Sequence, residues 1–279
     1  MTPDPAMLRG YRVLDITQFV AGPACTRILA DLGADVIKVE LAPYGDRARV
    51  QGFKPRAPEH RRSSASTYFF QHNHSKRSLA LDFKHERSRK LLRELAAKSH
   101  VLVENFALGV MERAGLSYAA LNALNPRLVM CSISLAGQTG PLSHKPDYDY
   151  IAQAYSGFTS LVGEPGHSPC QIPVAFGDVS TGVSAAMAIG FALLHQERTG
   201  RGQHVEATLI DTYFHMHESN VPKVAIRGDG FVPLRNGSQH NEDMLVELGL
   251  SQDEIAGLYA DGVLVHDRSL DQTPAQAGQ

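Results

Sequence analysis

The sequence contains few cysteines, and these lie far apart. Cys25, Cys131 and Cys170 are the three cysteines among 279 residues. No two of them have the CxxC spacing, which argues against both a cysteine-based zinc cluster and a disulfide framework. Such a chain fits a reducing compartment, and we expect a cytoplasmic protein.

The chain also lacks an excess of charge of either sign. Its formal net charge is -2, its pI is near 6.7, and charged residues make up 20% of it. No global positive field is available to hold a nucleic-acid backbone or an anionic membrane. We therefore expect no nucleic-acid partner, and any anionic ligand must be held by local groups.

Long apolar runs are missing as well. No stretch of about eighteen apolar residues occurs, and the first five residues have no basic start that leads into an apolar segment. We expect neither secretion nor a membrane span. Hydrophobic residues still make up 43% of the chain, so a packed fold is expected, as one large domain or two modest ones.

A strand–helix–strand pattern opens the chain. The run 11–16 is typical of a strand, and apolar residues recur at helical spacing over 24–32. Pro23 suits the first turn of that helix, and Gly33 suits its end. The run 36–40 is the next predicted strand. The turn that leads from the first strand into the helix is then a natural ligand site.

Strands and helices continue to alternate along the chain. We expect a surface loop over 44–66, an amphipathic helix over 86–98, and strands over 101–105 and 128–133. The helix expected over 181–197 is rich in alanine, which is typical of a helix packed closely on every side. This alternation predicts an α/β fold, a parallel sheet with helices on both faces.

Seven short motifs stand in order between Leu8 and Tyr213. They are Val13-Leu14-Asp15, Ala21-Gly22-Pro23, the run from Leu32 to Glu40, Lys76-Arg77-Ser78-Leu79, Val103-Glu104-Asn105-Phe106, Gly177-Asp178 and Thr199-Gly200-Arg201-Gly202-Gln203. Each is weak alone, but their order and spacing resemble the class III CoA-transferase (CaiB/BaiF) family. That family includes formyl-CoA and carnitine CoA-transferases and, as a relative, α-methylacyl-CoA racemase. The resemblance implies a Rossmann-like large domain that binds coenzyme A, assembled as an interlocked homodimer.

The resemblance also implies site residues. The coenzyme A contacts would be Gln18, Ala21, Lys76, Asn105, Phe106 and Arg113, with Asp147 and Tyr148 nearer the thiol end. Coenzyme A brings several phosphate charges and a planar adenine, so it needs a few cations, backbone amides and a stacking surface. These residue types fit that requirement, and no metal is expected.

Asp178 is the nucleophile that the resemblance implies. Its carboxylate would attack an acyl-CoA to give a mixed anhydride and free CoA thiolate, and the thiolate would convert the anhydride to an aspartyl-CoA thioester. An incoming carboxylic acid would reverse these steps. Backbone amides near Gly177 and Gly182 are candidates for holding the oxyanions. On pattern alone, the N-cap of a helix is the favoured interpretation of Asp178, and the resemblance reverses that preference.

The histidine pairs His72/His74 and His215/His217 suggest a metal site, because on a strand each pair would share one face. No acidic or cysteine partners accompany them at suitable spacing, so we favour no metal. Pro146 stands where the racemase branch has a histidine base. Because proline cannot move a proton, an acyl-CoA racemase or epimerase is the less favoured alternative.

The chain is too short for the family's small domain. We expect a coenzyme-binding large domain over 1–226, a junction over 227–240 where that small domain is missing, a C-terminal helical segment over 241–265 and a disordered tail over 266–279. The other alternative is therefore a catalytically impaired, truncated paralogue that binds coenzyme A.

Overall fold

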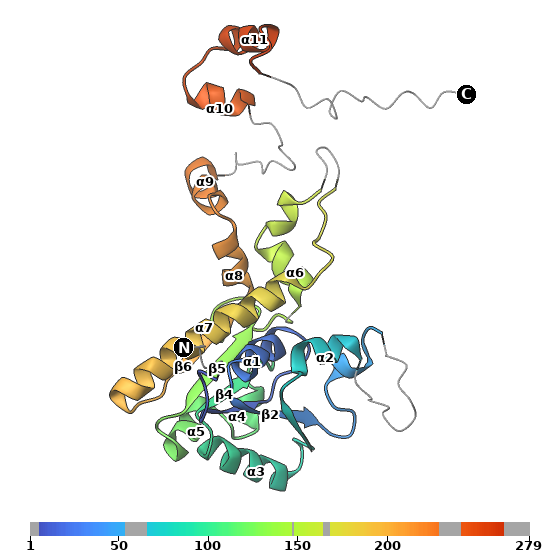
Figure 1. Cartoon of the computed structure of the whole chain (residues 1–279), viewed down its shortest axis with the longest axis vertical. Coiled ribbons are helices and arrows are strands. Elements are labelled where there is room, and N and C mark those ends of the chain that lie inside the picture. Colours follow the sequence, from blue (N-terminus) through green and yellow to red (C-terminus); the bar gives the residue numbers. More distant parts are fainter. Residues whose placement is uncertain (1–5, 54–65, 147, 164–167, 229–240, 265–279) are drawn as a thin grey trace, which may run out of the picture. The chain divides into compact units, whose positions relative to one another are not determined.

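The computed structural model describes residues 6–53, 66–146, 148–163, 168–228 and 241–264 (Figure 1). By its contacts, the chain divides into two units. The larger unit comes from 1–159 and 171–229, and the smaller one comes from 160–170 and 230–279. The larger unit contains the sheet and the predicted site residues.

A six-stranded parallel sheet forms the centre of the larger unit. Its strands are β1 (Arg12–Asp15), β2 (Asp35–Leu41), β3 (Arg77–Leu81), β4 (Val101–Glu104), β5 (Val129–Ser134) and β6 (His204–Thr208). They lie in the order β3-β2-β1-β4-β5-β6, and every neighbouring pair is parallel. The predicted α/β class with a Rossmann-like parallel sheet is confirmed.

The strand order reverses between β1 and β4. From β1 the chain adds β2 and β3 on one side, and it then returns to place β4 on the other side of β1. Leu14 accordingly pairs with Ile37 of β2 and with Leu102 of β4. Open α/β sheets bind ligands beyond the carboxyl ends of their strands at such a reversal. The segments that follow β1 and β4 therefore mark the expected site.

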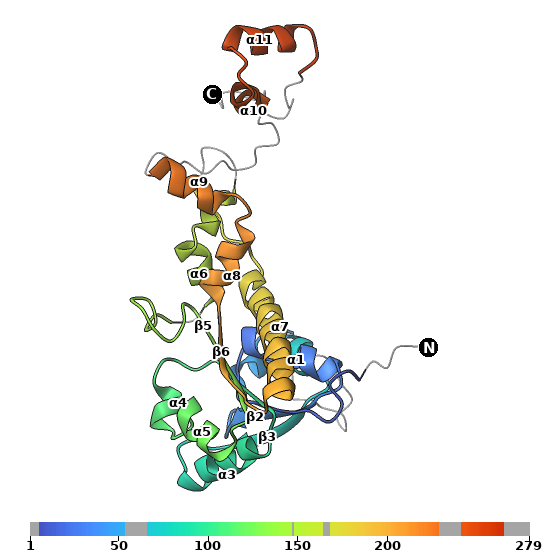
Figure 2. The same cartoon turned by 90° about the vertical axis from the view of Figure 1, so that its left-hand side faces the viewer.

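Helices connect the strands and cover both faces of the sheet (Figure 2). In the larger unit they are α1 (Ala21–Asp31), η1 (Arg47–Val50), α2 (Thr67–Asn73), α3 (Glu86–Ala97), α4 (Val110–Arg113), α5 (Tyr118–Leu124), α6 (Asp149–Tyr155), α7 (Phe176–Thr199), α8 (Leu209–Met216) and α9 (Asn220–Arg227). The short η3 (Phe158–Leu161) follows α6, and the smaller unit contains α10 (Asn241–Glu247) and α11 (Gln252–Ala260).

Each face of the sheet has its own hydrophobic core. Val13 of β1 packs in the core that α1 and α7 complete, whereas the next residue, Leu14, packs in the core that α3 and α5 complete. Successive strand residues point to opposite faces, so a strand covered on both faces is apolar along its whole length. This double burial explains why continuous apolar runs predicted these strands.

Helices α1 and α7 cross at very close range. A Cβ atom added to Gly182 would lie 2.7 Å from the backbone oxygen of Ala21 and 3.0 Å from the backbone nitrogen of Cys25. Only glycine therefore fits at this crossing without a shift of one backbone. The crossing places the first turn of α7 beside the start of α1, where the predicted site lies.

Helix α7 is long and apolar enough, by length and composition, to cross a membrane. Here it is a core helix, because Ala185 and Ile189 are fully buried in the core that it shares with α1. The expectation that it packs on every side is wrong. On the other face of α7, Met187 is 61% exposed and Phe191 is 65% exposed, because no described element of the larger unit packs there.

Part of the segment expected as a surface loop over 44–66 is buried. Asp46, Ala48 and Ser66 are inaccessible to solvent or nearly so, and Ala48 lies within η1. Hydrogen bonds join the three residues: Asp46 Oδ1 accepts from the Ala48 amide at 2.9 Å, and the Ser66 hydroxyl donates to the Ala48 carbonyl oxygen at 2.8 Å. Residues 54–65 of the expected loop lie outside the described residues.

The helical segment expected over 241–265 contains two helices, α10 and α11. Gly249 has a φ of 89°, which ends the first helix in the left-handed region. Ser251 then starts the second with a capping box: its hydroxyl accepts from the Glu254 amide, while the Glu254 carboxylate accepts from the Ser251 amide. The tail expected over 266–279 is outside the described residues.

Candidate active site

A cavity of about 430 Å³ lies at the carboxyl ends of the strands where the strand order reverses. Its walls come from the turn between β1 and α1, the segment after β4, the end of β5 and the starts of α7 and α8. The lining residues are Gln18, Phe19, Val20, Ala21, Gln51, Tyr68, Asn105, Ala107, Ile133, Ser134, Pro146, Tyr148, Asp178 and Leu209. The sheet topology thus predicts where the cavity is.

Asn105 ties the ends of β1 and β4 together. The Gln18 amide donates to Asn105 Oδ1 at 2.9 Å, and Asn105 Nδ2 donates to the Gln18 carbonyl oxygen at 2.9 Å. This reciprocal pair satisfies both backbone groups of Gln18 in a turn that has no strand partner there. The Asn105 amide therefore shapes the cavity wall.

The turn then enters α1 through an unusual backbone. Phe19 has a φ of 64°, in the left-handed region that non-glycine residues rarely occupy. Val20 is the N-cap of α1 and makes no side-chain capping bond, since valine has no acceptor. Ala21, the first residue of α1, lines the cavity, and the Val20 side chain caps none of the amides of that turn.

Asp178 projects from the first turn of α7 onto the wall of the cavity. The N-cap of α7 is Ala175, so the alternative interpretation of Asp178 as the N-cap is wrong. Among the described lining residues, Asp178 is the one with a charged side chain, and the others are apolar or neutral hydrogen-bonding groups. Such surroundings leave Asp178 as the one fixed charge of the described cavity wall.

Asp149 holds the backbone that carries Asp178. Its Oδ1 accepts hydrogen bonds from the Asp178 amide and from the Tyr213 hydroxyl, both at 3.0 Å. Its Oδ2 accepts from Gln153 Nε2 at 2.6 Å. The Tyr213 hydroxyl in turn accepts from the Gly177 amide at 3.0 Å. The Gly177 amide is thus engaged and does not face the cavity as the expected oxyanion donor.

Two tyrosines keep their protons beside these carboxylates. Burial, followed by the charge of Asp149, raises the pKa of Tyr213. Burial also raises the pKa of Tyr68, and the charges of Asp178, Asp46 and Asp149 add to this effect. Tyr68 is therefore a hydrogen-bond donor that lines the same cavity as Asp178. It lies in α2, and no motif in the sequence identified it.

Five of the predicted site residues line one cavity: Gln18, Ala21, Asn105, Tyr148 and Asp178. They come from four separate segments, which the fold brings together. Their roles toward coenzyme A stay predictions.

Phe106 and Arg113 do not line this cavity. Phe106 lies between two neighbouring hollows and packs edge to face with Phe83, with ring centroids 5.8 Å apart. Arg113 is on α4, where its side chain lies over Gly109. Asp147 falls outside the described residues.

Lys76 lies beneath the cavity rather than on its wall. Its ammonium donates to Asp15 Oδ2 at 3.0 Å, to the Pro23 carbonyl oxygen at 3.0 Å, to Thr26 Oγ1 at 2.8 Å and to Asn73 Oδ1 at 2.9 Å. Burial lowers the pKa of Lys76 to about 8, although the Asp15 charge opposes that shift. The four bonds join β1, α1 and α2, and a direct contact with a coenzyme phosphate stays a prediction.

The two histidine pairs lie at the ends of helices, not on strands. His72 is in α2 and His74 follows it, while His215 is in α8 and His217 follows it. His217 Nε2 lies 2.8 Å from the Ser156 carbonyl oxygen, within the fold. Within the part of the chain that the structure describes, no three His, Cys, Asp or Glu side chains are grouped as metal ligands.

Comparison with known proteins gives one consistent family. The model of CoA-transferase family III matches residues 8–249. The chain is 39% identical over 235 residues to the succinate–glutarate CoA-transferase of Agrobacterium fabrum, covering 84% of this chain and 58% of that protein. It is 38% identical over 232 residues to the acetyl-CoA:oxalate CoA-transferase of Acetobacter aceti, covering 83% and 57% respectively.

The fold has a solved counterpart. A CaiB/BaiF family protein from Brucella suis superposes with a TM-score of 0.76 at 39% identity, covering 82% of this chain and 60% of that one. The chain thus spans little more than half the length of the curated relatives described above.

Proposed function

The chain belongs to CoA-transferase family III, and we propose that it transfers coenzyme A from an acyl-CoA to a free carboxylic acid, with Asp178 as the nucleophile. One observation carries this proposal. The Asp178 carboxylate is the charged side chain on a cavity wall that otherwise presents neutral groups, at the reversal of the strand order. A carboxylate so placed suits covalent attack on a neutral thioester.

The reaction proceeds by balanced acyl and thioester exchanges. The Asp178 carboxylate attacks the acyl carbon, the C–S bond breaks, and a mixed anhydride and CoA thiolate form. The thiolate then attacks the aspartyl carbon of the anhydride, which releases the first acid and leaves an aspartyl-CoA thioester. The second acid attacks this thioester, and CoA thiolate then takes the acyl group from the new anhydride and restores Asp178.

The donors near Asp178 suit the oxyanions of these steps. The Tyr68 hydroxyl, protonated because its pKa is raised by burial and by neighbouring carboxylates, lines the same cavity. The first turn of α1 adds backbone amides at Ala21. Donors fixed in place before the reaction stabilise developing negative charge better than solvent does. In this proposal they take the role that was expected of the Gly177 amide, because that amide already donates to the Tyr213 hydroxyl.

Short dicarboxylic acids are the proposed acid substrates. The two curated relatives act, by their names, on succinate and glutarate and on oxalate. Gln51 and Tyr148 on the cavity wall offer neutral hydrogen-bond donors for a substrate carboxylate. Succinyl-CoA with glutarate or oxalate is therefore the first combination to assay.

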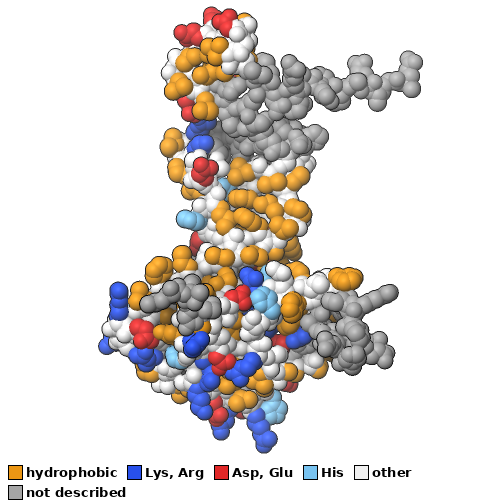
Figure 3. All heavy atoms as spheres, viewed as in Figure 1, with side chains coloured by type: hydrophobic (Ala, Val, Ile, Leu, Met, Phe, Trp, Pro, Cys, Tyr) orange, Lys and Arg blue, Asp and Glu red, His pale blue; other side chains and the backbone are white. Residues whose placement is uncertain are grey.

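We also propose a cytoplasmic homodimer. Hydrophobic side chains gather over α6 and α8 on the larger unit (Figure 3), and the open face of α7 adds Val183, Met187 and Phe191. Apolar surface of this extent marks association in soluble proteins. Cys25, Cys131 and Cys170 are free, which fits a reducing compartment.

Covalent trapping tests the proposed nucleophile. The protein is incubated with succinyl-CoA and then with hydroxylamine, which attacks an aspartyl thioester, releases CoA thiol and leaves a hydroxamate on the aspartate. Peptide mass spectrometry should find the hydroxamate at Asp178. The Asp178→Asn variant should show none, and the matched Asp211→Asn variant, which changes an exposed aspartate in the first turn of α8, should react as the wild type does.

A second candidate is a protein that binds coenzyme A without turnover. Its support is the Gly177 amide, an expected oxyanion donor, which is already bonded to the Tyr213 hydroxyl. Calorimetry with coenzyme A separates the two candidates. Binding without any adduct at Asp178 favours the second, whereas an adduct establishes the first. Racemisation is less favoured, because Pro146 lines the cavity where that chemistry needs a base.

A further inference from the structure

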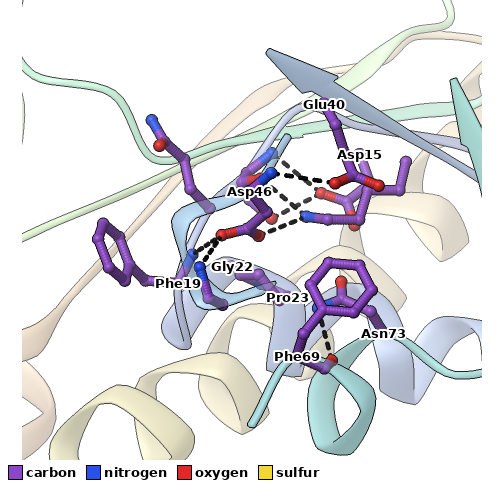
Figure 4. A network of polar contacts seen from close by, with 12 residues as sticks. Asp15, Phe19, Gly22, Pro23, Glu40, Asp46, Phe69 and Asn73 are labelled. Atoms are coloured by element: carbon purple, nitrogen blue, oxygen red, sulfur yellow. Dashed lines mark hydrogen bonds and ion pairs between the residues drawn. The ribbon is translucent and has the colours of Figure 1, made fainter. Parts of the chain in front are cut away.

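A cluster of buried charges lies under the turn between β1 and α1 (Figure 4). Lys38 Nζ and Asp46 Oδ2 are 3.0 Å apart, and each side chain is only 1% exposed. Burying two charges is unfavourable unless the pair makes further hydrogen bonds, so such a pair is weak evidence for stability and calls for another role. The further hydrogen bonds of Lys38 and Asp46 join the turn and η1, two segments next to the cavity.

The inner backbone groups of the turn are held by side chains from other elements. Lys38 Nζ donates to the Thr17 carbonyl oxygen at 2.9 Å. The Phe19 amide donates to Asp46 Oδ1 at 3.2 Å, the contact visible at the left of Figure 4. Phe19 is the residue with the left-handed backbone. Asp46 and Lys38 thus hold a conformation that the turn residues do not favour by themselves.

Asp46 also holds a second wall of the same cavity. Its Oδ1 accepts from the Ala48 amide at 2.9 Å and so caps η1. The Gln51 amide, at the end of η1, donates to the Ala48 carbonyl oxygen at 3.2 Å. Phe19 and Gln51 both line the cavity with Asp178. One carboxylate oxygen therefore joins two cavity walls that are far apart in sequence.

The position of Asp46 is itself fixed by neighbouring groups. Its amide donates to Glu40 Oε2 at 3.0 Å, and Glu40 is held in turn by Arg49 and by Ser78. Asp46 therefore cannot move without disturbing β2 and η1. This rigidity is what a group that positions other residues needs.

We propose that Asp46, together with Lys38, is a positioning residue that sets the width of the acyl-CoA cavity between Phe19 and Gln51. This inference rests on the proposed function, because it assigns the cavity to coenzyme A or its acyl group. Neither side chain touches the substrate. Losing the pair should widen the binding cavity and weaken coenzyme binding, with a smaller effect on the chemistry at Asp178.

The test removes the pair without leaving an unpaired buried charge. The variant K38M/D46L replaces two buried charged groups with apolar groups, a type of exchange that often preserves folding. The single variant Asp46→Asn is measured beside it. The matched control is Asp35→Asn, which weakens exposed ion pairs with Arg12 and Arg77 at the opposite end of the strands.

Two measurements on the whole chain decide the proposal. Hydrogen exchange of the free protein should become at least about ten-fold faster in the peptides that contain Phe19 and Ala48, with no change around β4. The Kd for coenzyme A by calorimetry should rise at least about ten-fold, while the rate of adduct formation at Asp178 with saturating succinyl-CoA stays within about three-fold of wild type. The Asp35→Asn control should change none of these values.

The inference would be overturned if a folded K38M/D46L variant kept the wild-type hydrogen exchange in the peptides that contain Phe19 and Ala48. An unchanged Kd for coenzyme A in that variant would overturn it as well. An equal loss of adduct rate and binding would also overturn it, because that result indicates general damage to the fold. If the wild type binds no coenzyme A, the proposed function fails instead. Exchange then still decides whether Asp46 holds the two walls, since that measurement needs no ligand.

Discussion

Replacing Asp149 with asparagine should loosen the start of α7. The carboxylate accepts two hydrogen bonds at Oδ1 and one from Gln153 at Oδ2. Asparagine keeps one acceptor oxygen but turns an amide donor toward the Gln153 donor. Gln153 cannot simply flip, because its Oε1 already accepts from the Ile172 amide at 2.8 Å.

The size of this effect follows from the bonds involved. Two bonds to a charged acceptor become bonds to a neutral one, at about 1 kcal/mol each, and the donor–donor conflict adds about 1–3 kcal/mol. We expect a total loss of about 3–5 kcal/mol. For a unit of this size, about 2–4 °C of Tm is lost per kcal/mol, so Tm should fall by about 6–20 °C.

The assay is a double-mutant cycle with Tyr213→Phe. That variant keeps the buried ring but removes the hydroxyl, which leaves the Gly177 amide unpaired. Because Asp149 and Tyr213 share one network, the double variant should lose at least about 1 kcal/mol less than the sum of the single losses. Strict additivity, or an Asp149→Asn variant as stable as the wild type, would refute this account of the start of α7.

Three further predictions follow from the fold. Gly182→Val should cost about 1–3 kcal/mol by thermal unfolding, because its side chain meets the α1 backbone, whereas Gly190→Ala on the same helix meets no atom within 4 Å and should be neutral or stabilising. Burial raises the pKa of Glu40, but bonds from Arg49, Ser78 and the Asp46 amide lower it to about 2. Since the folded pKa lies below the unfolded one, about 2 kcal/mol of stability, discounted for solvent screening, should be lost as the pH falls from about 4.5 to 2, and Glu40→Gln should remove that dependence. Phe191→Glu should dissociate the proposed homodimer in light scattering, and Arg87→Glu on α3 should not.

The sequence predicted the strands well because their burial on both faces leaves a simple signature. Val101 and its neighbours are apolar without interruption, and each such run became a strand of the sheet. Edge strand β3 and the short helices α4 and α5 carry weaker patterns and were not predicted. The segment around Asp46 was expected to be exposed because it is polar. Its burial depends on partners in β2 and η1 that no local pattern reveals.

For the site, the sequence identified individual residues but not how their side chains are arranged in space. Asp178, Asn105 and Gln18 were predicted from motifs, and they do line one cavity. Lys76 was expected to contact coenzyme A, which stays a prediction; in the structure its ammonium lies within hydrogen-bond distance of four groups from β1, α1 and α2. Tyr68 was missed because no motif marks it, and its position beside Asp178 follows from the packing of α2 against α1.

Helix α7 joins the proposed chemistry to the proposed assembly. Its first turn carries Asp178, its crossing with α1 depends on Gly182, and its open face carries Met187 and Phe191. A helix transmits displacement along its axis because its backbone bonds are continuous. The close crossing at Gly182 resists a shift of the whole helix. The proposed nucleophile is therefore held by its own chain, through Asp149 and Gly182, and the proposed association would cover the apolar face.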